Sequence, residues 1–317
     1  MADRIIYADV QAAAHRIRGT VRPVAVAAAD PAQPDGAPGR HFALEQLQFT
    51  GTFKARGAQN FLRAHLDSDA LPDAGVTIAS GGNAGMACAW AGGRHGVPAT
   101  VFVPASVPQV KIDRLRGYGA DVRLIDGPFA AAWDACDEFA ADTGALKSHA
   151  YDDPLIAAGA GTLMMEIVDR LPAVETVAVA VGGGGLFAGV AAVAAHHGIR
   201  VVAVEPERAP TLHAALNARR PVEVEVGGVA ADSLGGRQVS EPAFAAAQRG
   251  DVRSVLVPDE EIVRARQELW EGHRLAVEHA AAAAVAGVGP TAPYRPAGGE
   301  QVCVILCGAN TDPSDLR

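Results

Sequence analysis

The chain has 317 residues, 49% of them hydrophobic, and a formal net charge of −9. This length indicates one large or two medium domains, and no apolar run is long enough to span a membrane, so no membrane partner is expected. The basic residues are scattered through a net acidic chain, which argues against a nucleic-acid partner.

Short β-branched runs alternate with alanine-rich segments along most of the chain. Strands are predicted, the first three of them buried, at residues 76–80, 99–104, 121–125, 176–181, 200–205, 254–257 and 301–306. Helices are predicted between and after them, at residues 85–95, 110–117, 153–171, 187–197, 210–218 and 259–275. The repeated strand–helix order predicts an α/β fold with parallel sheets covered by helices on both faces.

The cysteines and the N-terminal residues indicate a reduced compartment. No two of the four cysteines form a C-x-x-C pair, which disfavours both a zinc site and a disulfide framework. The first residues lack the basic start and the unbroken apolar core of a signal peptide. A cytoplasmic protein is therefore expected.

Lysine is scarce: only Lys54, Lys111 and Lys147 occur among the 27 basic residues. Arginine stays protonated and cannot act as an amine nucleophile. A lysine retained in such a chain is therefore a candidate for amine chemistry. Lys54 lies beside Phe53 and between glycines, in the segment Gly51-Thr52-Phe53-Lys54-Ala55-Arg56-Gly57-Ala58. Desolvation there would lower its pKa toward that of a nucleophilic amine. An ordinary surface loop is the alternative interpretation of this segment.

Two glycine-rich segments each follow a predicted strand and open a predicted helix. The segment Ser80-Gly81-Gly82-Asn83-Ala84 would direct backbone N–H groups at a carboxylate or a phosphate. The run of four glycines from Gly182 to Gly185, followed by Leu186, favours close approach by a phosphate. An alternative interpretation is that this run binds the phosphates of a dinucleotide. Gly183, Gly185 and Ala188 fit G-x-G-x-x-A, and Glu205 ends the next strand.

A fourth segment, from Cys307 to Asn310, follows the last predicted strand, where ligands of parallel sheets bind. Taken in order, the segments resemble the serine/threonine dehydratase family of fold-type II pyridoxal-phosphate (PLP) enzymes, and their motifs are most similar to those of animal-type serine dehydratases. The lysine segment matches the family's G-[ST]-F-K-x-R-G-A, and Ser80-Gly81-Gly82-Asn83 matches its S-x-G-N. The stretches Tyr151–Pro154 and Gly159–Thr162 resemble its F-D-D-P and G-Q-G-T.

The resemblance implies a tryptophan synthase β-like fold of two domains, each with a mostly parallel twisted sheet flanked by helices. Residues 47–147 would form the small domain, which carries Lys54 and the Ser-Gly-Gly-Asn loop. Residues 1–46 and 148–317 would form the large, PLP-binding domain. A homodimer is also expected from the family.

The resemblance also implies a role for each matching residue. Lys54 would hold PLP as a Schiff base and later act as the base at the substrate Cα. The other implied PLP contacts are Phe53 beside the ring, Asn83 at the 3′-oxygen, the backbone N–H groups of Gly182, Gly183, Gly184, Gly185 and Leu186 at the phosphate, and Cys307 at the ring nitrogen. The implied contacts of the substrate are Ser80, Gly81, Asn83 and Ala84. A monovalent cation such as K⁺ would bind at Glu205, Ala209 and Thr211.

The implied reaction is β-elimination from L-serine, L-threonine or a related β-hydroxy-amino acid, which yields a 2-oxo acid and ammonia. Racemases of the family carry a serine at the position of Gly81, so racemisation is disfavoured here. Departures from the family pattern, such as Ala43 and Ala160, touch the substrate side and leave phenylserine and hydroxyaspartate open as substrates. An NAD-dependent oxidoreductase would leave Lys54 without a use. A non-catalytic ligand-binding relative would be expected to have lost Lys54 or Asn83.

Overall fold

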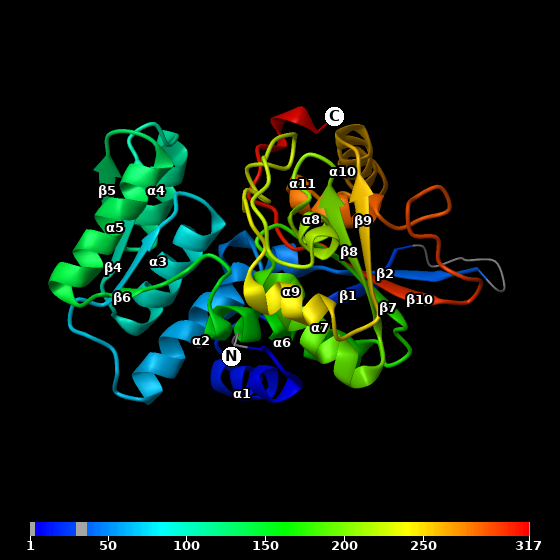
Figure 1. Cartoon of the computed structure of the whole chain (residues 1–317), viewed down its shortest axis with the longest axis horizontal. Helices are drawn as coiled ribbons and strands as arrows, with labels where there is room; N and C mark the ends of the chain where they lie inside the picture. The colour runs from blue at the N-terminus through cyan, green and yellow to red at the C-terminus, as the bar shows by residue number, and fades with distance from the viewer. Residues whose placement is uncertain (1–3, 30–36, 317) are drawn as a thin grey trace.

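The computed structural model describes residues 4–29 and 37–316, and its strands form two sheets. The larger sheet has the order β1-β2-β10-β7-β8-β9 and the smaller one the order β5-β4-β3-β6. Within the described residues every strand pairing is parallel except that of β1 with β2. Figure 1 shows the smaller sheet in the left-hand half of the molecule and the larger sheet in the right-hand half. The predicted α/β fold with mostly parallel sheets is confirmed.

The elements have the following bounds. The strands are β1 Val26–Ala28, β2 Gly39–Ala43, β3 Val76–Ala79, β4 Ala99–Pro104, β5 Asp121–Ile125, β6 Leu146–Lys147, β7 Thr176–Ala180, β8 Arg200–Pro206, β9 Val252–Val257 and β10 Gln301–Ile305. The helices are α1 Tyr7–Ile17, α2 Lys54–Asp67, α3 Asn83–His95, α4 Gln109–Gly117, α5 Phe129–Thr143, α6 Pro154–Arg170, α7 Gly185–His197, α8 Thr211–Ala218, α9 Glu241–Ala247, α10 Asp259–His273 and α11 His279–Ala286.

The central strands of the larger sheet are apolar on both faces. Every residue of β7 is buried, and in β8 only the first residue is part-exposed. Helices α7 and α11 both contact β7 and β8, and Figure 1 shows α7 below these strands and α11 above them. Such continuous apolar runs are what a parallel sheet covered on both sides requires.

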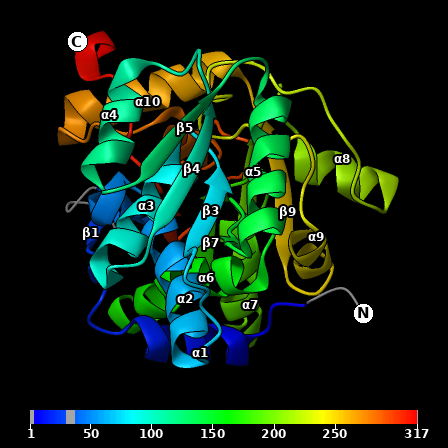
Figure 2. The same ribbon diagram turned by 90° about the vertical axis from the view of Figure 1, so that its left-hand side faces the viewer.

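The smaller sheet is covered by α3 and α4 toward one side and by α5 toward the other (Figure 2). Its strands β3 and β4 are buried as predicted, apart from the last residue of β4. The strand predicted at residues 121–125 is present, but the prediction that it is buried is wrong. Strand β5 pairs only with β4 at the edge of the sheet, and its residues Asp121, Arg123 and Leu124 are exposed.

The strands of the smaller sheet fall between residues 76 and 147, which is compatible with a small domain of residues 47–147. Helix α2 contacts both α3 of the left-hand half and α6 of the right-hand half, so the domain boundaries stay predictions. None of the helices in the described ranges is long and apolar enough to cross a membrane.

Helices α6 and α7 cross at a contact that only glycine permits. A Cβ atom on Gly189 would lie 2.3 Å from the carbonyl oxygen of Ala157 and 2.6 Å from Cα of Gly161. A Cβ on Gly161 would lie 2.8 Å from the backbone of Gly189. The two helices therefore pack backbone against backbone, and this fixes the start of α7 relative to the loop before α6.

Gly189→Ala is expected to lower the free energy of unfolding by about 1–3 kcal/mol, because the added methyl overpacks this crossing. Gly272→Ala is the matched control, since Gly272 is also helical and a Cβ there meets no atom within 4 Å. Denaturant unfolding of both variants measures the effect. Equal free energies of unfolding for the two variants would contradict the account of the crossing.

Candidate active site

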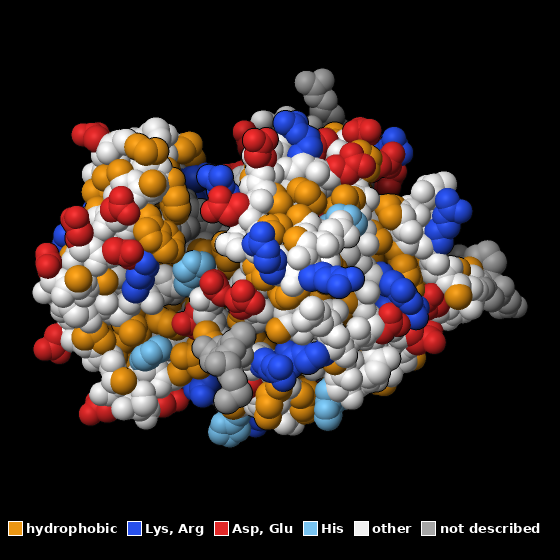
Figure 3. All heavy atoms as spheres, in the orientation of Figure 1, with side chains coloured by type: hydrophobic (Ala, Val, Ile, Leu, Met, Phe, Trp, Pro, Cys, Tyr) orange, Lys and Arg blue, Asp and Glu red, His pale blue; other side chains and the backbone are white. Residues whose placement is uncertain are grey.

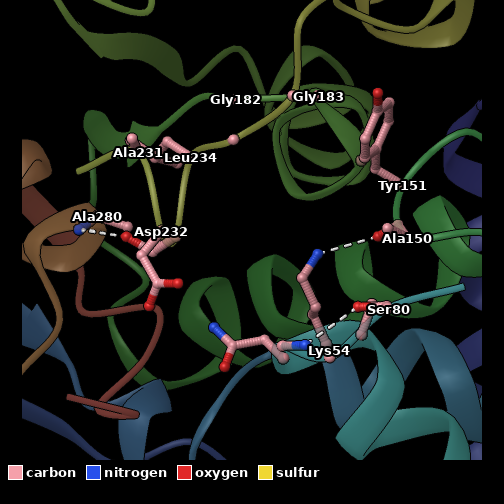
Figure 4. A pocket seen from close by; sticks show the side chains of 18 of the residues that line it. Lys54, Ser80, Ala150, Tyr151, Gly182, Gly183, Ala231, Asp232, Leu234 and Ala280 are labelled. Atoms are coloured by element: carbon pink, nitrogen blue, oxygen red, sulfur yellow. Dashed lines mark hydrogen bonds between the residues drawn. The ribbon is translucent and has the colours of Figure 1, made fainter. Parts of the chain in front are cut away.

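A cavity of about 620 Å³ lies between the two halves of the molecule and is lined from both. Its lining includes all of the residues predicted to bind PLP or substrate, namely Phe53, Lys54, Ser80, Gly81, Asn83, Ala84, Gly182, Gly183, Gly184, Gly185, Leu186 and Cys307. Figure 4 shows the Lys54 side chain extending into this space, with Gly182 and Gly183 on the far side of it. Segments that are distant in the sequence thus meet around one lysine.

Backbone hydrogen bonds fix the lysine segment against the segment that follows β10. The N–H of Phe53 donates to the carbonyl of Cys307 at 3.0 Å, and the N–H of Ala309 donates to the carbonyl of Gly51 at 2.9 Å. Thr52 and Gly308 form an isolated bridge between these two bonds. Lys54, the first residue of α2, is therefore held beside Cys307 by the backbone itself.

The Lys54 amine reaches a cavity wall that carries both apolar and polar groups. Its Nζ donates to the carbonyl of Ala150 at 3.0 Å (Figure 4). Burial lowers the pKa of Lys54 from 10.5 to about 8, although the nearby Glu278 and Cys307 act in the opposite direction. A pKa near 8 gives a much larger fraction of neutral, nucleophilic amine near neutral pH than an ordinary lysine has.

The four-glycine loop between β7 and α7 could not carry larger residues. A Cβ on Gly183 would lie 2.4 Å from ring atoms of Tyr151, and Gly184 has a φ of 93° with Ala243 2.4 Å from the position of its Cβ. Helix α7 begins directly after Gly184 without a side-chain cap. Its first N–H groups therefore have no partner within the helix and are suited to an anion such as a phosphate.

Asn83 is held by two neighbours that fix its amide orientation. Asn310 Nδ2 donates to Asn83 Oδ1 at 2.8 Å, and Asn83 Nδ2 donates to Glu278 Oε2 at 3.0 Å. Asn310 Nδ2 also donates to the carbonyl of Thr50 at 2.8 Å, which ties the network to the lysine segment. The Asn83 amide group is thereby fixed at the cavity wall.

Glu278 is a site residue that the sequence did not reveal. Its carboxyl group is buried in the cavity wall. Burial raises the pKa of Glu278 to about 7, against the opposing effects of Asn83 and Lys54. The small residue Gly308 was the available signal, because a Cβ on it would lie 2.3 Å from Glu278 Oε1.

Glu278→Gln is expected to stabilise the cofactor-free protein only at higher pH. The native carboxyl group holds its proton more tightly than the unfolded one, so the wild type loses stability as the pH rises from 4.5 to about 7. A rise in pKa of this size corresponds to about 3 kcal/mol of stability, which the wild type has lost above pH 7. The variant has no carboxyl group to ionise and would keep this stability. The difference between the two proteins would therefore vanish near pH 4. Denaturant unfolding across this pH range measures the difference. A difference that does not change with pH would show that Glu278 does not titrate as described.

Cys307 presents a neutral thiol to the cavity. Its side chain is buried, and burial raises the pKa of the thiol well above its ordinary value of 9. A thiol in this state carries no negative charge near neutral pH. It could therefore contact a heteroaromatic nitrogen without supplying a full charge.

The loop before α3 forms another part of the cavity wall. Ser80 Oγ accepts the N–H of Gly82 at 3.3 Å (Figure 4). A Cβ on Gly81 would lie 3.2 Å from Val107, and Gly81 offers no side chain for proton transfer. Helix α3 begins at Asn83 with no side-chain cap, so this loop too directs unpaired N–H groups outward.

Glu205, the acidic residue of the predicted cation site, is buried and caps α8. Its carboxylate accepts the backbone N–H of Leu212 at 2.6 Å and that of His213 at 2.8 Å, and it accepts from the Thr211 hydroxyl at 3.0 Å. Over residues 4–29 and 37–316 no three His, Cys, Asp or Glu side chains converge as a metal site. The cation stays a prediction.

The residues around this cavity fit PLP. The lysine amine has a lowered pKa, the glycine loop leaves the start of α7 open to a phosphate, and the neutral thiol and the fixed amide of Asn83 complete the wall. The volume of about 620 Å³ also leaves room for a second small molecule beside the cofactor.

The fold and this site together define the class of the protein. Residues 27–308 match the family model described as pyridoxal-phosphate dependent enzyme, and the chain belongs to this family. The predicted fold-type II PLP enzyme is therefore confirmed, and the NAD-dependent alternative is set aside. The cofactor of the family is PLP.

Two named relatives and one solved structure are similar to this chain over most of its length. L-threonine ammonia-lyase of Geobacter sulfurreducens is 38% identical over 274 residues, which cover 86% of this chain and 67% of that protein. Phenylserine dehydratase of Ralstonia pickettii is 35% identical over 274 residues, which cover 86% of this chain and 83% of that protein. The processed form of threonine deaminase isoform 2 from Solanum lycopersicum has a TM-score of 0.88 and 29% identity over 98% of this chain and 85% of that one.

These relatives bear out the resemblance to serine/threonine dehydratases that the motifs indicated. The chain spans about two thirds of the length of the two threonine ammonia-lyases that it matches.

Proposed function

We propose that the protein catalyses the PLP-dependent β-elimination of a 3-hydroxy-amino acid such as L-serine or L-threonine, with release of a 2-oxo acid and ammonia. The observation that carries this proposal is the Lys54 amine, whose pKa is lowered to about 8 in a cavity between two loops that can each bind an anion. One loop suits the cofactor phosphate and the other suits the substrate carboxylate. Similarity to ammonia-lyases and dehydratases supports the same reaction.

When bound, PLP supplies an electron sink for negative charge at the substrate Cα. Lys54 would hold the cofactor covalently and, once released, accept the Cα proton. A general base works best when its pKa lies near the operating pH, and the pKa of about 8 meets this condition. The carbonyl of Ala150, 3.0 Å from Nζ, would orient the amine.

The remaining residues would bind and orient. The N–H groups from Gly182 to Leu186 would hold the phosphate, and Asn83 would donate to the 3′-oxygen with its amide fixed by Asn310. Ser80, Gly81 and Ala84 with their neighbours would hold the substrate carboxylate. Phe53 would pack beside the ring, and Cys307 would meet the ring nitrogen as a neutral thiol.

Elimination is favoured over racemisation within this proposal. Racemisation requires a second proton donor on the other side of the substrate Cα. Gly81 occupies the position at which such a donor would stand and has no side chain.

The cation, the dimer and the compartment are finer parts of the proposal. Glu205 and Thr211 lie beside the glycine loop, since Thr211 Oγ1 is 2.6 Å from the carbonyl oxygen of Gly182 and 3.0 Å from the Glu205 carboxyl group. A monovalent cation such as K⁺ bound by Glu205, Ala209 and Thr211 would stabilise this loop. The homodimer, the two-domain division and the cytoplasmic location rest on the resemblance and on the sequence.

The purified protein, loaded with PLP, tests the function directly. L-Serine and L-threonine are each expected to change the visible absorbance of the cofactor and to release the corresponding 2-oxo acid with an equal amount of ammonia. Bound PLP without release of an oxo acid or ammonia from any 3-hydroxy-amino acid would contradict the proposal and would favour a non-catalytic ligand-binding protein.

A further inference from the structure

A continuous series of aromatic rings leads from the Lys54 amine to the mouth of the cavity. The ring centroids of Tyr151 and His149 are 4.8 Å apart, those of His149 and Trp133 5.6 Å, and those of Trp133 and Phe129 6.4 Å. All four residues line the cavity. We call them the aromatic wall.

The inner end of the aromatic wall lies next to the reacting amine. Ala150, whose carbonyl accepts from Lys54 Nζ at 3.0 Å, stands between His149 and Tyr151 in the chain. Figure 4 shows Tyr151 and Ala150 on the same side of the lysine. A substituent on the substrate Cβ that points toward Tyr151 and His149 would therefore run along these rings.

The outer end of the aromatic wall is exposed. Phe129 keeps 52% of its surface accessible, and Trp133 is half-buried. In Figure 3 hydrophobic side chains gather on the left-hand part of the molecule beside the groove that separates it from the right-hand part. Phe129 and Trp133 therefore offer apolar surface along the lining of the cavity, which an apolar ligand group could cover.

The histidine of the wall acts as a neutral ring. Its Nδ1 accepts the backbone N–H of Asp152 at 2.7 Å and that of Tyr151 at 3.2 Å, which leaves the proton on Nε2. Burial lowers the pKa of His149 below its ordinary value of 6.5. His149 therefore adds no positive charge to the wall.

The other lysine and arginine of the described lining, Lys111 and Arg237, each lie near an acid, and the Arg237 pair is long and exposed. Lys111 Nζ lies 2.8 Å from Asp232 Oδ1, and Arg237 lies 3.7 Å from Glu223 with most of its side chain in solvent. On the aromatic wall itself, Lys147 Nζ lies 3.9 Å from the Trp133 ring centroid and is paired with Asp137, so among the described residues a second carboxylate, as in 3-hydroxyaspartate, would find no unpaired lysine there. The charges thus disfavour acidic substituents, and the rings favour aromatic ones.

We infer that the preferred substrate is a 3-hydroxy-amino acid with an aromatic β-substituent, which binds along the aromatic wall with its outer edge against Trp133 and Phe129. This inference rests on the proposed elimination reaction and names the substrate class of the same site. The ring of the substrate would displace water from Phe129 and extend the existing series of ring contacts.

The test compares L-threo-phenylserine, L-threonine and 3-hydroxyaspartate on the PLP-loaded protein. The expected kcat/KM for phenylserine exceeds that for threonine by about tenfold or more, and that for 3-hydroxyaspartate is the lowest. Phe129→Ala is expected to lower kcat/KM for phenylserine by about tenfold and to leave that for threonine within about twofold. Phe129 is largely exposed, so the variant should fold.

Two further variants sharpen this test. Trp133→Leu should act on phenylserine in the same direction as Phe129→Ala. Phe139→Leu is the matched control, because Phe139 lies on the same helix but packs against Phe102, with centroids 5.6 Å apart. Wild-type preference for threonine, or an equal loss for both substrates in Phe129→Ala, would overturn the inference.

Unreactive ligands separate this inference from the proposed function. L-Phenylalanine and L-alanine lack the β-hydroxyl group, so their binding to the loaded protein is measured without turnover. Tighter binding of L-phenylalanine than of L-alanine, lost in Phe129→Ala, supports the aromatic wall even if no substrate is eliminated. Absence of elimination would contradict the proposed function alone. Equal binding of the two ligands would overturn the aromatic wall whatever the turnover.

Discussion

Lys54→Ala is expected to reduce the release of oxo acid and ammonia by at least about 10³-fold, because Lys54 is the residue proposed both to attach PLP covalently and to act as the base at Cα. The visible band of the cofactor should shift or disappear in the same variant. The structure offers no replacement amine at this position, since Lys111 is paired with Asp232 and Lys147 with Asp137. Absorbance spectra and a coupled oxo-acid assay measure both effects.

Two lysine variants serve as controls for this result. Lys54→Arg keeps the positive charge but cannot form the covalent link, so it should be as inactive as Lys54→Ala. Lys147→Arg keeps the ion pair with Asp137 and should leave turnover of L-threonine within about twofold, as surface changes usually do. Activity in Lys54→Arg near that of the wild type would mean that Lys54 contributes only charge.

Gly183→Ala is expected to weaken PLP binding by about tenfold or more. The new Cβ would lie 2.4 Å from the Tyr151 ring, so the ring or the loop must move. Overpacking of this kind costs about 1–3 kcal/mol, and 1.4 kcal/mol corresponds to a tenfold change in affinity. Titration of the cofactor-free protein with PLP, followed by absorbance, gives the dissociation constant.

The control for Gly183→Ala is again Gly272→Ala, where the added Cβ meets no atom within 4 Å and PLP affinity should not change. Circular dichroism shows whether each variant keeps the fold. An unchanged PLP affinity in a folded Gly183→Ala variant would mean that the loop does not hold the phosphate.

Most of the alternating strands and helices could be predicted because a parallel sheet requires apolar strands of fixed order. Strand β7 is predicted at residues 176–181 and observed at Thr176–Ala180, and β8 agrees to within one residue. Burial was less predictable at sheet edges. The run at residues 121–125 carries charged residues at Asp121 and Arg123, which are typical of an exposed strand face, and β5 lies at the sheet edge with both of them exposed.

The residues of the glycine and lysine motifs could be predicted as site residues, because the residue types within each motif indicate a binding role. Glu278 had no signal in its own segment, only the distant one of Gly308. Its role depends on Asn83 and on the absence of a side chain at Gly308, and these residues are far from it in the sequence. The aromatic wall was also hidden, because Phe129 and Trp133 resemble ordinary residues of an alanine-rich helix until α5 is placed beside His149.

The most direct test of the central claim is to treat the PLP-loaded protein with borohydride and to map the modified peptide by mass spectrometry. The expected result is one phosphopyridoxyl group on the peptide that contains Lys54, with none on the peptides that contain Lys111 or Lys147. Modification at another lysine, or no fixed cofactor after saturation with PLP, would contradict the assignment of this cavity as the active site.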